Sequence, residues 1–409
     1  MSKWNFPLSL LCVITFMNLM SVNLNAQTKP SARDLQVVRF TSGTSALRIP
    51  FELSNNLIIV PVRVNGSRTL HFIFDTGASI SVLDPGTARS MRLRESGKLK
   101  LDATGGSVQS GTIKELSLAI SGVEVRHQTV ATVPLDSMSP LFGFKIDGII
   151  GYHFIKNFVV EIDYKNSLLN LYEPTTYNYS GTGDLVPITL VEGTPLVCGK
   201  LLLANREPIE GQFEVDTGGD GMLGLNTPFV KTHKLLESLP NQMQSKLGGA
   251  GGTSAAIKAR VSGIQVGNVT VRDPLVVFAQ GTEGSEGSTE YDGELGGAFF
   301  KQAKLIIDYS RSRIILEAYD SSPRVEDLSG LEIFAEGPRF TTFVVNGVTP
   351  NTPASAAGLK EEDVIVAVDG RAASTMTLSQ LRKMFMETGK RYRLRIKRGK
   401  QIIPLEMQL

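Results

Sequence analysis

One long stretch of this sequence occurs twice, and the duplication constrains the fold more than any other feature. The segment from 49 to 174 resembles the segment from 185 to 319. In both copies an apolar run ends in Asp-Thr-Gly, with the aspartates at Asp75 and Asp216, 141 positions apart. Internal similarity at a fixed offset indicates two equivalent structural units that pack together.

A second motif repeats at nearly the same offset. Asp147-Gly148-Ile149-Ile150-Gly151 returns 145 positions later as Asp292-Gly293-Glu294-Leu295-Gly296. Around these motifs the pattern is typical of β-structure, since two apolar runs flank the turn Asn65-Gly66 before Asp75. We therefore expect a mostly β fold with two lobes. Short helices are expected near 85–91, 152–157, 228–236 and 298–303.

Composition and the N-terminus limit the remaining possibilities. The net charge of +2 gives no indication of a nucleic-acid partner. Lys3, the apolar run 8–20 and the small residues before Gln27 are typical of a signal peptide, and the run is too short to span a bilayer. The mature chain would be periplasmic, in the cell envelope or extracellular, without a transmembrane segment. It would keep Cys198 as its single thiol and form no internal disulfide.

The two Asp-Thr-Gly sequences resemble the active-site loops of the pepsin/retropepsin superfamily of aspartic peptidases. The resemblance covers about 49–319 and implies two retropepsin-like β-barrel lobes forming a pseudo-dimer within one chain. It implies that Asp75 and Asp216 are catalytic, share a proton and activate water against a peptide bond, with peptides or proteins as substrates and no cofactor or metal. The loops would be supported by Thr76, Gly77, Thr217 and Gly218.

Two glycine-rich hairpins occupy the position of the flaps of that superfamily. They lie at 102–108 and 247–254, and a glycine-rich tip suits a lid that closes over a substrate. Flexible surface hairpins without substrate contact are the alternative. The candidate flap residues are Gly105, Gly106, Gly249 and Gly251.

Three further features bear on the site. Asp220 follows the second loop and would either raise a neighbouring pKa or point into solvent. The acidic stretch with Glu283, Glu286 and Glu290 is interpreted as a solvated insertion. Changes such as Gly219-Asp220 in the second loop leave a second hypothesis open, a catalytically inactive peptide-binding protein on the same bilobal fold. None of the four histidines shows metal-ligand spacing.

The last part of the chain resembles a bacterial PDZ domain, an α+β module. The resemblance rests on the run 343–370 and on a helix that begins at a capping box of Thr377 and Gln380. It implies capture of a peptide ligand by strand addition, with a candidate peptide loop at Gly337 and Phe340. A packing module without peptide binding is the alternative.

The expected organisation follows from these boundaries. It comprises a signal peptide (1–26), an N-terminal segment (27–48), a first peptidase lobe (49–174), a linker (175–184), a second lobe (185–319), a linker (320–327) and a PDZ-like domain (328–409). The PDZ-like domain would recruit substrates or regulate the peptidase.

Overall fold

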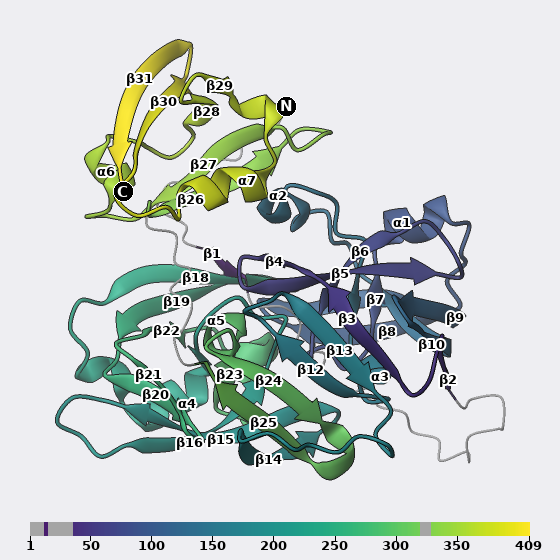
Figure 1. The fold of residues 1–409 in the computed structure, drawn as a ribbon. Coiled ribbons are helices and arrows are strands. Elements are labelled where there is room, and N and C mark those ends of the chain that lie inside the picture. Colours follow the sequence, from purple (N-terminus) through teal and green to yellow (C-terminus); the bar gives the residue numbers. More distant parts are fainter. Residues whose placement is uncertain (1–11, 15–35, 320–328) are drawn as a thin grey trace. The chain divides into compact units, whose positions relative to one another are not determined.

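The structure is a computed structural model that describes residues 12–14, 36–319 and 329–409. Its described residues form two compact units (Figure 1). The larger contains 36–135 and 147–319, and the smaller contains 136–146 and 329–409. The predicted signal peptide, apart from strand β1 (Cys12–Ile14), and the linker 320–327 lie outside the described residues. No helix in the described ranges has the length and hydrophobicity to cross a membrane.

The fold is mostly β, and its first lobe is a closed barrel. The ring of strands runs β10-β7-β11-β6-β5-β9 and closes because β9 also pairs with β10. Strand β5 is apolar on both faces and almost wholly buried, as expected for a strand in the middle of a core. The lobe contains β2 (Val37–Phe40), β4 (Glu52–Ser54), β5 (Leu57–Val64), β6 (Leu70–Phe74), β7 (Val82–Leu83), β8 (Gly97–Ala103), β9 (Gly106–Ile120), β10 (Val123–Thr132), β11 (Gly148–Ile150), α1 (Pro85–Ser90) and α3 (Tyr152–Ile155).

The second lobe repeats this arrangement. Strand β16, like β6, is flanked by a parallel partner and by an antiparallel partner, here β23 and β15. Two strands of the first barrel are divided here, because β19 and β20 together take the place of β9, and β21 and β22 together take the place of β10. The lobe contains β15 (Thr194–Leu202), β16 (Ile209–Val215), β17 (Gly224–Leu225), β18 (Met243–Gly249), β19 (Gly252–Arg260), β20 (Gly263–Val266), β21 (Val269–Arg272), β22 (Leu275–Ala279), β23 (Gly293–Leu295), α4 (Thr227–Thr232), η1 (Leu235–Glu237), η2 (Gly284–Gly287) and α5 (Gly297–Phe300).

A shared sheet joins the two lobes, in the order β14-β25-β24-β12-β13-β3. Its two central strands are antiparallel, and Glu161 lies opposite Ile306, the residue 145 positions later. Equivalent strands of the two lobes, β12 and β24, therefore pair with each other, and the pseudo-two-fold axis passes between them. The strands are β3 (Ser45–Pro50), β12 (Val159–Asp163), β13 (Leu168–Tyr172), β14 (Asp184–Val191), β24 (Ala303–Asp308) and β25 (Arg313–Ala318), with η3 (Tyr309–Arg311) between the last two.

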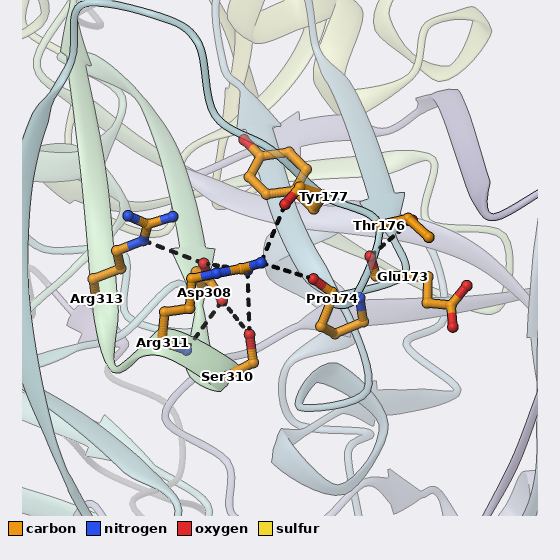
Figure 2. Close-up of polar contacts among 8 residues, drawn as sticks. All are labelled: Glu173, Pro174, Thr176, Tyr177, Asp308, Ser310, Arg311 and Arg313. Atoms are coloured by element: carbon orange, nitrogen blue, oxygen red, sulfur yellow. Dashed lines mark hydrogen bonds and ion pairs between the residues drawn. The ribbon is translucent and has the colours of Figure 1, made fainter.

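An arginine fastens the connection between the lobes to this sheet (Figure 2). Arg311 Nη2 donates to the carbonyls of Pro174 at 3.0 Å and Tyr177 at 3.2 Å. Its Nη1 donates to Asp308 Oδ2 at 2.9 Å, and Arg313 Nε donates to the same oxygen at 3.2 Å. Asp308 is fully buried, so these bonds satisfy a carboxylate that would otherwise be costly to bury. The linker is thereby held against the second lobe.

The smaller unit is an α+β domain with its own apolar core. Its sheet runs β26-β27-β28-β30-β31, so β26 is an edge strand. The predicted capping box is present, since Thr377 Oγ1 accepts from Gln380 N and Gln380 Oε1 accepts from Thr377 N. The elements are β26 (Leu331–Glu336), β27 (Thr342–Val348), β28 (Val364–Val368), β29 (Arg371–Ala372), β30 (Arg391–Arg398), β31 (Gln401–Gln408), α6 (Pro353–Ala356), η4 (Ala373–Thr375), α7 (Leu378–Met384) and α2 (Ser139–Phe142).

Two features of the fold differ from what the sequence indicates. Strands β2 and β3 begin before residue 49, so part of the N-terminal segment belongs to the sheets of the first lobe and of the lobe junction. Helix α2 lies in the first-lobe sequence but packs within the smaller unit. The four expected helical regions overlap α1, α3, α4 and α5.

Candidate active site

Asp75 and Asp216 come directly after equivalent strands and meet in the interior of the larger unit. Asp75 follows β6, and its N–H donates to the carbonyl of Ile150 at 3.0 Å. Asp216 follows β16, and its N–H donates to the carbonyl of Leu295 at 3.0 Å. The repeated apolar-Gly strands, β11 and β23, therefore lie in parallel beside the strands that carry the aspartates. The two side chains are 0% and 1% exposed.

The two loops are fastened to each other by their threonines. Thr76 Oγ1 donates to the carbonyl of Val215 at 2.5 Å, and Thr217 Oγ1 donates to the carbonyl of Phe74 at 2.7 Å. Each hydroxyl also accepts from the N–H of the other threonine, at 3.0 and 3.1 Å. Four reciprocal bonds across the pseudo-two-fold axis leave the carboxyl groups little freedom to separate.

Backbone donors orient the carboxyl groups. Gly77 N and Ala78 N donate to Asp75 Oδ1 at 2.8 and 2.9 Å, and Gly218 N donates to Asp216 Oδ1 at 2.7 Å. No side chain could replace Gly218, because a Cβ there would lie 2.2 Å from Asp75 Cγ. The two loops approach so closely that glycine is required for contact, and both are fixed before any substrate binds.

Burial and mutual repulsion shift the ionisation of both aspartates. Burial, then the charge of Asp216, raises the pKa of Asp75 well above its usual value. Burial raises the pKa of Asp216 to about 6, although backbone donors and the hydrogen bond with Asp75 act in the opposite direction. The site therefore holds one proton between two carboxyl groups over a range of pH in which isolated aspartates are ionised.

The second lobe adds acidic side chains that the first lobe lacks. Glu214 and Glu294 lie opposite each other on the parallel strands β16 and β23. Glu214 is fully buried, and its Oε1 lies 2.8 Å from the position of a Cβ on Gly77, as does Asp216 Oδ1. Burial and these carboxylates raise the pKa of Tyr291 well above its usual value. The sequence shows both glutamates, but only the strand pairing brings them beside the aspartates.

Asp220 lies at a junction between the lobes. It is partly buried, and its carbonyl accepts from Asn56 Nδ2 at 2.8 Å. Asn56 Oδ1 in turn accepts from Lys301 Nζ at 2.9 Å. Where the second loop departs from the first, it therefore contacts the β4–β5 turn of the opposite lobe.

The two candidate flaps meet at their tips. Gly251 N donates to the carbonyl of Thr104 at 3.0 Å. A Cβ on Gly105 would lie 2.4 Å from the backbone carbon of Gly252, and one on Gly251 would lie 2.4 Å from the carbonyl oxygen of Gly106. Gly249 lies within its own hairpin, opposite Gly252. Glycine is needed here because two backbones pass each other in van der Waals contact.

The acidic stretch after β22 is solvated only in part, which corrects the interpretation from sequence: Glu283 and Glu290 are exposed, but Glu286 is buried. Glu286 is 3% exposed and accepts from Gly105 N at 3.1 Å through Oε1 and at 3.2 Å through Oε2. Ser254 Oγ of the other flap donates to Glu286 Oε1 at 2.5 Å. Gly284, at φ +63°, lets the chain turn inward against Ala103. One carboxylate thus holds both flaps, and it also lines a small pocket with Glu294 and Leu247.

Replacing Glu286 with alanine should loosen both flaps. A charge-assisted hydrogen bond contributes about 1.5–3 kcal/mol, so backbone amides at 101–109 and 247–254 should exchange hydrogen roughly 10-fold faster or more. Mass spectrometry of deuterium uptake measures this. Glu290→Ala, an exposed glutamate of the same loop, is the matched control and should leave both hairpins unchanged. Unchanged exchange in Glu286→Ala would show that the carboxylate does not restrain the flaps.

The candidate peptide loop of the smaller unit lies at the turn between β26 and β27. Phe340, at φ +52°, donates its N–H to the carbonyl of Gly337 at 3.0 Å within this turn. That amide is therefore already used locally. Among the described residues, no group of three or more histidine, cysteine, aspartate or glutamate side chains is arranged to hold a metal ion.

Comparison with known families agrees with this geometry. The aspartyl protease family model matches residues 60–154, which include Asp75, the first flap and β11. A PDZ domain model matches residues 344–398, from β27 to the end of β30. No curated protein gives a significant match to the sequence. The second lobe lies outside both matches, so its equivalence to the first rests on the internal repeat and on the shared sheet.

Proposed function

We propose that this chain, a retropepsin-like protease with a C-terminal PDZ domain, is an aspartic endopeptidase in which Asp75 and Asp216 form one catalytic unit. One observation carries the proposal. Two buried aspartates face each other, and reciprocal threonine bonds hold them in this position. A structural role alone does not account for this arrangement, because two carboxyl groups buried side by side destabilise a fold.

Burial raises both pKa values, so the pair keeps one proton between its two carboxyl groups. In the proposed mechanism the ionised carboxyl group, assigned to Asp216, accepts a proton from the attacking water. The protonated carboxyl group, assigned to Asp75, donates a hydrogen bond to the carbonyl oxygen of the scissile peptide bond. When the tetrahedral intermediate collapses, the proton taken up by Asp216 passes to the leaving amine. Closed flaps would exclude bulk water during these steps.

Activity should therefore require a pH at which only one carboxyl is protonated. Asp216 loses its proton as pH rises through about 6, so kcat/KM should be about 10-fold lower at pH 5 than on its plateau. At higher pH the activity should fall again once Asp75 ionises. Digestion of a proteome-derived peptide library from pH 4 to 9, read by mass spectrometry, measures this profile.

Asp75→Asn is the control for that digestion and should release no new peptides at any pH. An optimum near pH 4 would contradict the raised pKa of the pair. A well-folded wild-type protein that cleaves nothing across the whole range would instead support the alternative, an inactive peptide-binding protein on the same fold.

The setting of the activity follows from other parts of the chain. The N-terminal residues are typical of a signal peptide, so we place the enzyme outside the cytoplasm, in the periplasm, the cell envelope or the medium. Its partners are peptides or proteins as substrates. The PDZ domain suggests an additional peptide ligand, with recruitment or regulation as its role.

A further inference from the structure

A segment of the peptidase sequence lies against the PDZ domain, between its edge strand and its helix. Residues 136–146 leave the first barrel after β10 and return at β11, and they pack with residues of the PDZ domain in one unit. Figure 1 shows α2 of this segment beside α7. Strand β26 lies on the other side of the segment from α7. Among the described strands, β26 pairs only with β27, so its outer edge forms no backbone hydrogen bonds to another strand.

Arg382 of α7 joins the segment to the edge strand. Its Nη2 donates to the carbonyl of Ile333 in β26 at 2.8 Å. Its Nη1 donates to the carbonyl of Leu141 in α2 at 2.7 Å. Leu141 and Phe142 are 4% and 2% exposed. A single guanidinium therefore binds the strand and the segment together, and apolar side chains fill the space beside it.

The end of the segment fits this groove closely. Gly143 ends α2 in the left-handed conformation, at φ +76°. A Cβ at this position would lie 2.8 Å from Leu378 Cβ and 3.5 Å from Ala335 Cβ, which belong to α7 and β26. Only glycine combines this backbone conformation with contact on both walls. The segment is thus shaped to the groove and does not merely pass over it.

The internal repeat gives this loop a counterpart of known behaviour. Residues 136–146 correspond to 281–291 at the offset of 145. In the second lobe that stretch contains η2, and through Glu286 it holds both flaps. In the first lobe the equivalent stretch binds the PDZ domain instead. Equivalent loops of the two lobes therefore have different partners. The loop of the second lobe restrains the flaps, and the loop of the first lobe is held by the PDZ domain.

We propose that the groove between β26 and α7 is a binding site for the chain's own segment 138–143, and that an external peptide binds there only by displacing it. The segment docks as a helical turn, which covers the edge where a peptide would add as a strand. Because the segment continues directly into β11 beside the Asp75 loop, peptide binding at the PDZ domain is linked to the first lobe. In this way the PDZ domain regulates the first lobe.

Binding of the segment in trans tests this proposal without any need for peptidase activity. The probe is a fluorescein-labelled synthetic peptide of residues 136–146, added to the full chain and followed by fluorescence anisotropy. In Gly143→Val the resident segment should leave, because a branched side chain meets Leu378 at an unfavourable φ. We expect this variant to bind the probe at least 10-fold more tightly than the wild type. Equal affinities would overturn the proposal, as would no binding to the variant.

Two further variants keep the result interpretable. Gly399→Val places valine at φ +58° in the same domain, with nothing within 4 Å, and should bind the probe as the wild type does. Arg382→Ala, combined with Gly143→Val, should lose the gain in affinity, since the probe then lacks the donor to its Leu141 carbonyl. If the double variant binds as tightly as Gly143→Val, the probe occupies some other site and the proposal fails.

Hydrogen exchange tests docking in the native chain if Gly143→Val does not fold. Arg382→Ala removes the donor to the carbonyls of Leu141 and Ile333, so backbone amides of 138–143 should exchange hydrogen at least about 10-fold faster than in the wild type. Arg371→Ala, at an exposed arginine of the same domain, is the control and should leave these amides unchanged. Unchanged exchange in Arg382→Ala would mean that the PDZ domain does not hold the segment in solution.

Discussion

Asp75→Asn, Asp216→Asn and the double variant should each lower kcat/KM by a similar factor, roughly 10³ or more. In the proposed mechanism the two carboxyl groups share one proton and perform one acid–base step, so removing either removes the step and removing the second costs little more. Initial rates on one peptide from the library, at the optimal pH of the wild type, measure all three losses. Losses that multiply in the double variant would contradict a shared mechanism.

Stability provides an internal control for the same variants. The pKa of Asp216 is raised from 3.8 to about 6, so the folded protein holds a proton that the unfolded chain has released. The folded wild type is therefore more stable at low pH, and its free energy of unfolding falls as pH rises from 3.8 to about 6. At pH 8 each single variant should be more stable than the wild type, by about 1–3 kcal/mol. At pH 3 the difference should vanish.

That comparison separates a lost catalyst from a lost fold. Urea unfolding at both pH values gives the free energies of unfolding. Variants that are inactive yet more stable at pH 8 have lost chemistry alone. Lower stability at pH 8 would mean that the carboxylates are needed to hold the loops, and the threonine bonds would then be insufficient to do so.

The sequence predicts those parts of the site that are local or repeated. The apolar run before each Asp-Thr-Gly predicts a strand that ends at the aspartate, and the structure has β6 and β16 there. The constant offset of 145 predicts equivalent lobes. Its physical counterpart is the register of the shared sheet, in which Glu161 pairs with Ile306. Repetition therefore carries long-range information that a single motif does not.

The parts that the sequence does not predict depend on contacts between distant segments. Glu286 lies in a stretch whose glycines, serines and acids are typical of a solvated loop, and its burial depends on two hairpins far away in the chain. Helix α2 is a single turn, which is too short for an apolar periodicity to predict it. It is stabilised by Arg382, which lies some 240 residues later in the sequence. The composition of a segment indicates how unfavourable its burial is, but whether it is buried depends on the distant residues that it contacts.

Gly218→Ala should reduce kcat/KM by at least about 100-fold although it adds a single methyl group. A Cβ on this residue would lie 2.2 Å from Asp75 Cγ and 2.4 Å from Asp75 Oδ2, so the carboxyl group must move. Displacement of a catalytic group by about 1 Å is enough for a loss of this size. Overpacking of the buried loop should also lower the free energy of unfolding by roughly 1–3 kcal/mol. Steady-state kinetics and urea unfolding of the same preparation measure the two effects.

Gly224→Ala is the matched control, since it adds the same methyl group to a strand of the same lobe. Its nearest neighbour would be Glu294 Cγ at 3.4 Å, an ordinary contact, so activity should stay within about 3-fold of the wild type. If Gly218→Ala also retained near-wild-type activity, the two loops would have to be farther apart in solution than the threonine bonds allow. The shared-proton mechanism depends on that separation, because repulsion between the carboxyl groups weakens steeply as they move apart. A normal rate in Gly218→Ala would therefore contradict the close approach of Asp75 and Asp216 on which the proposed function rests.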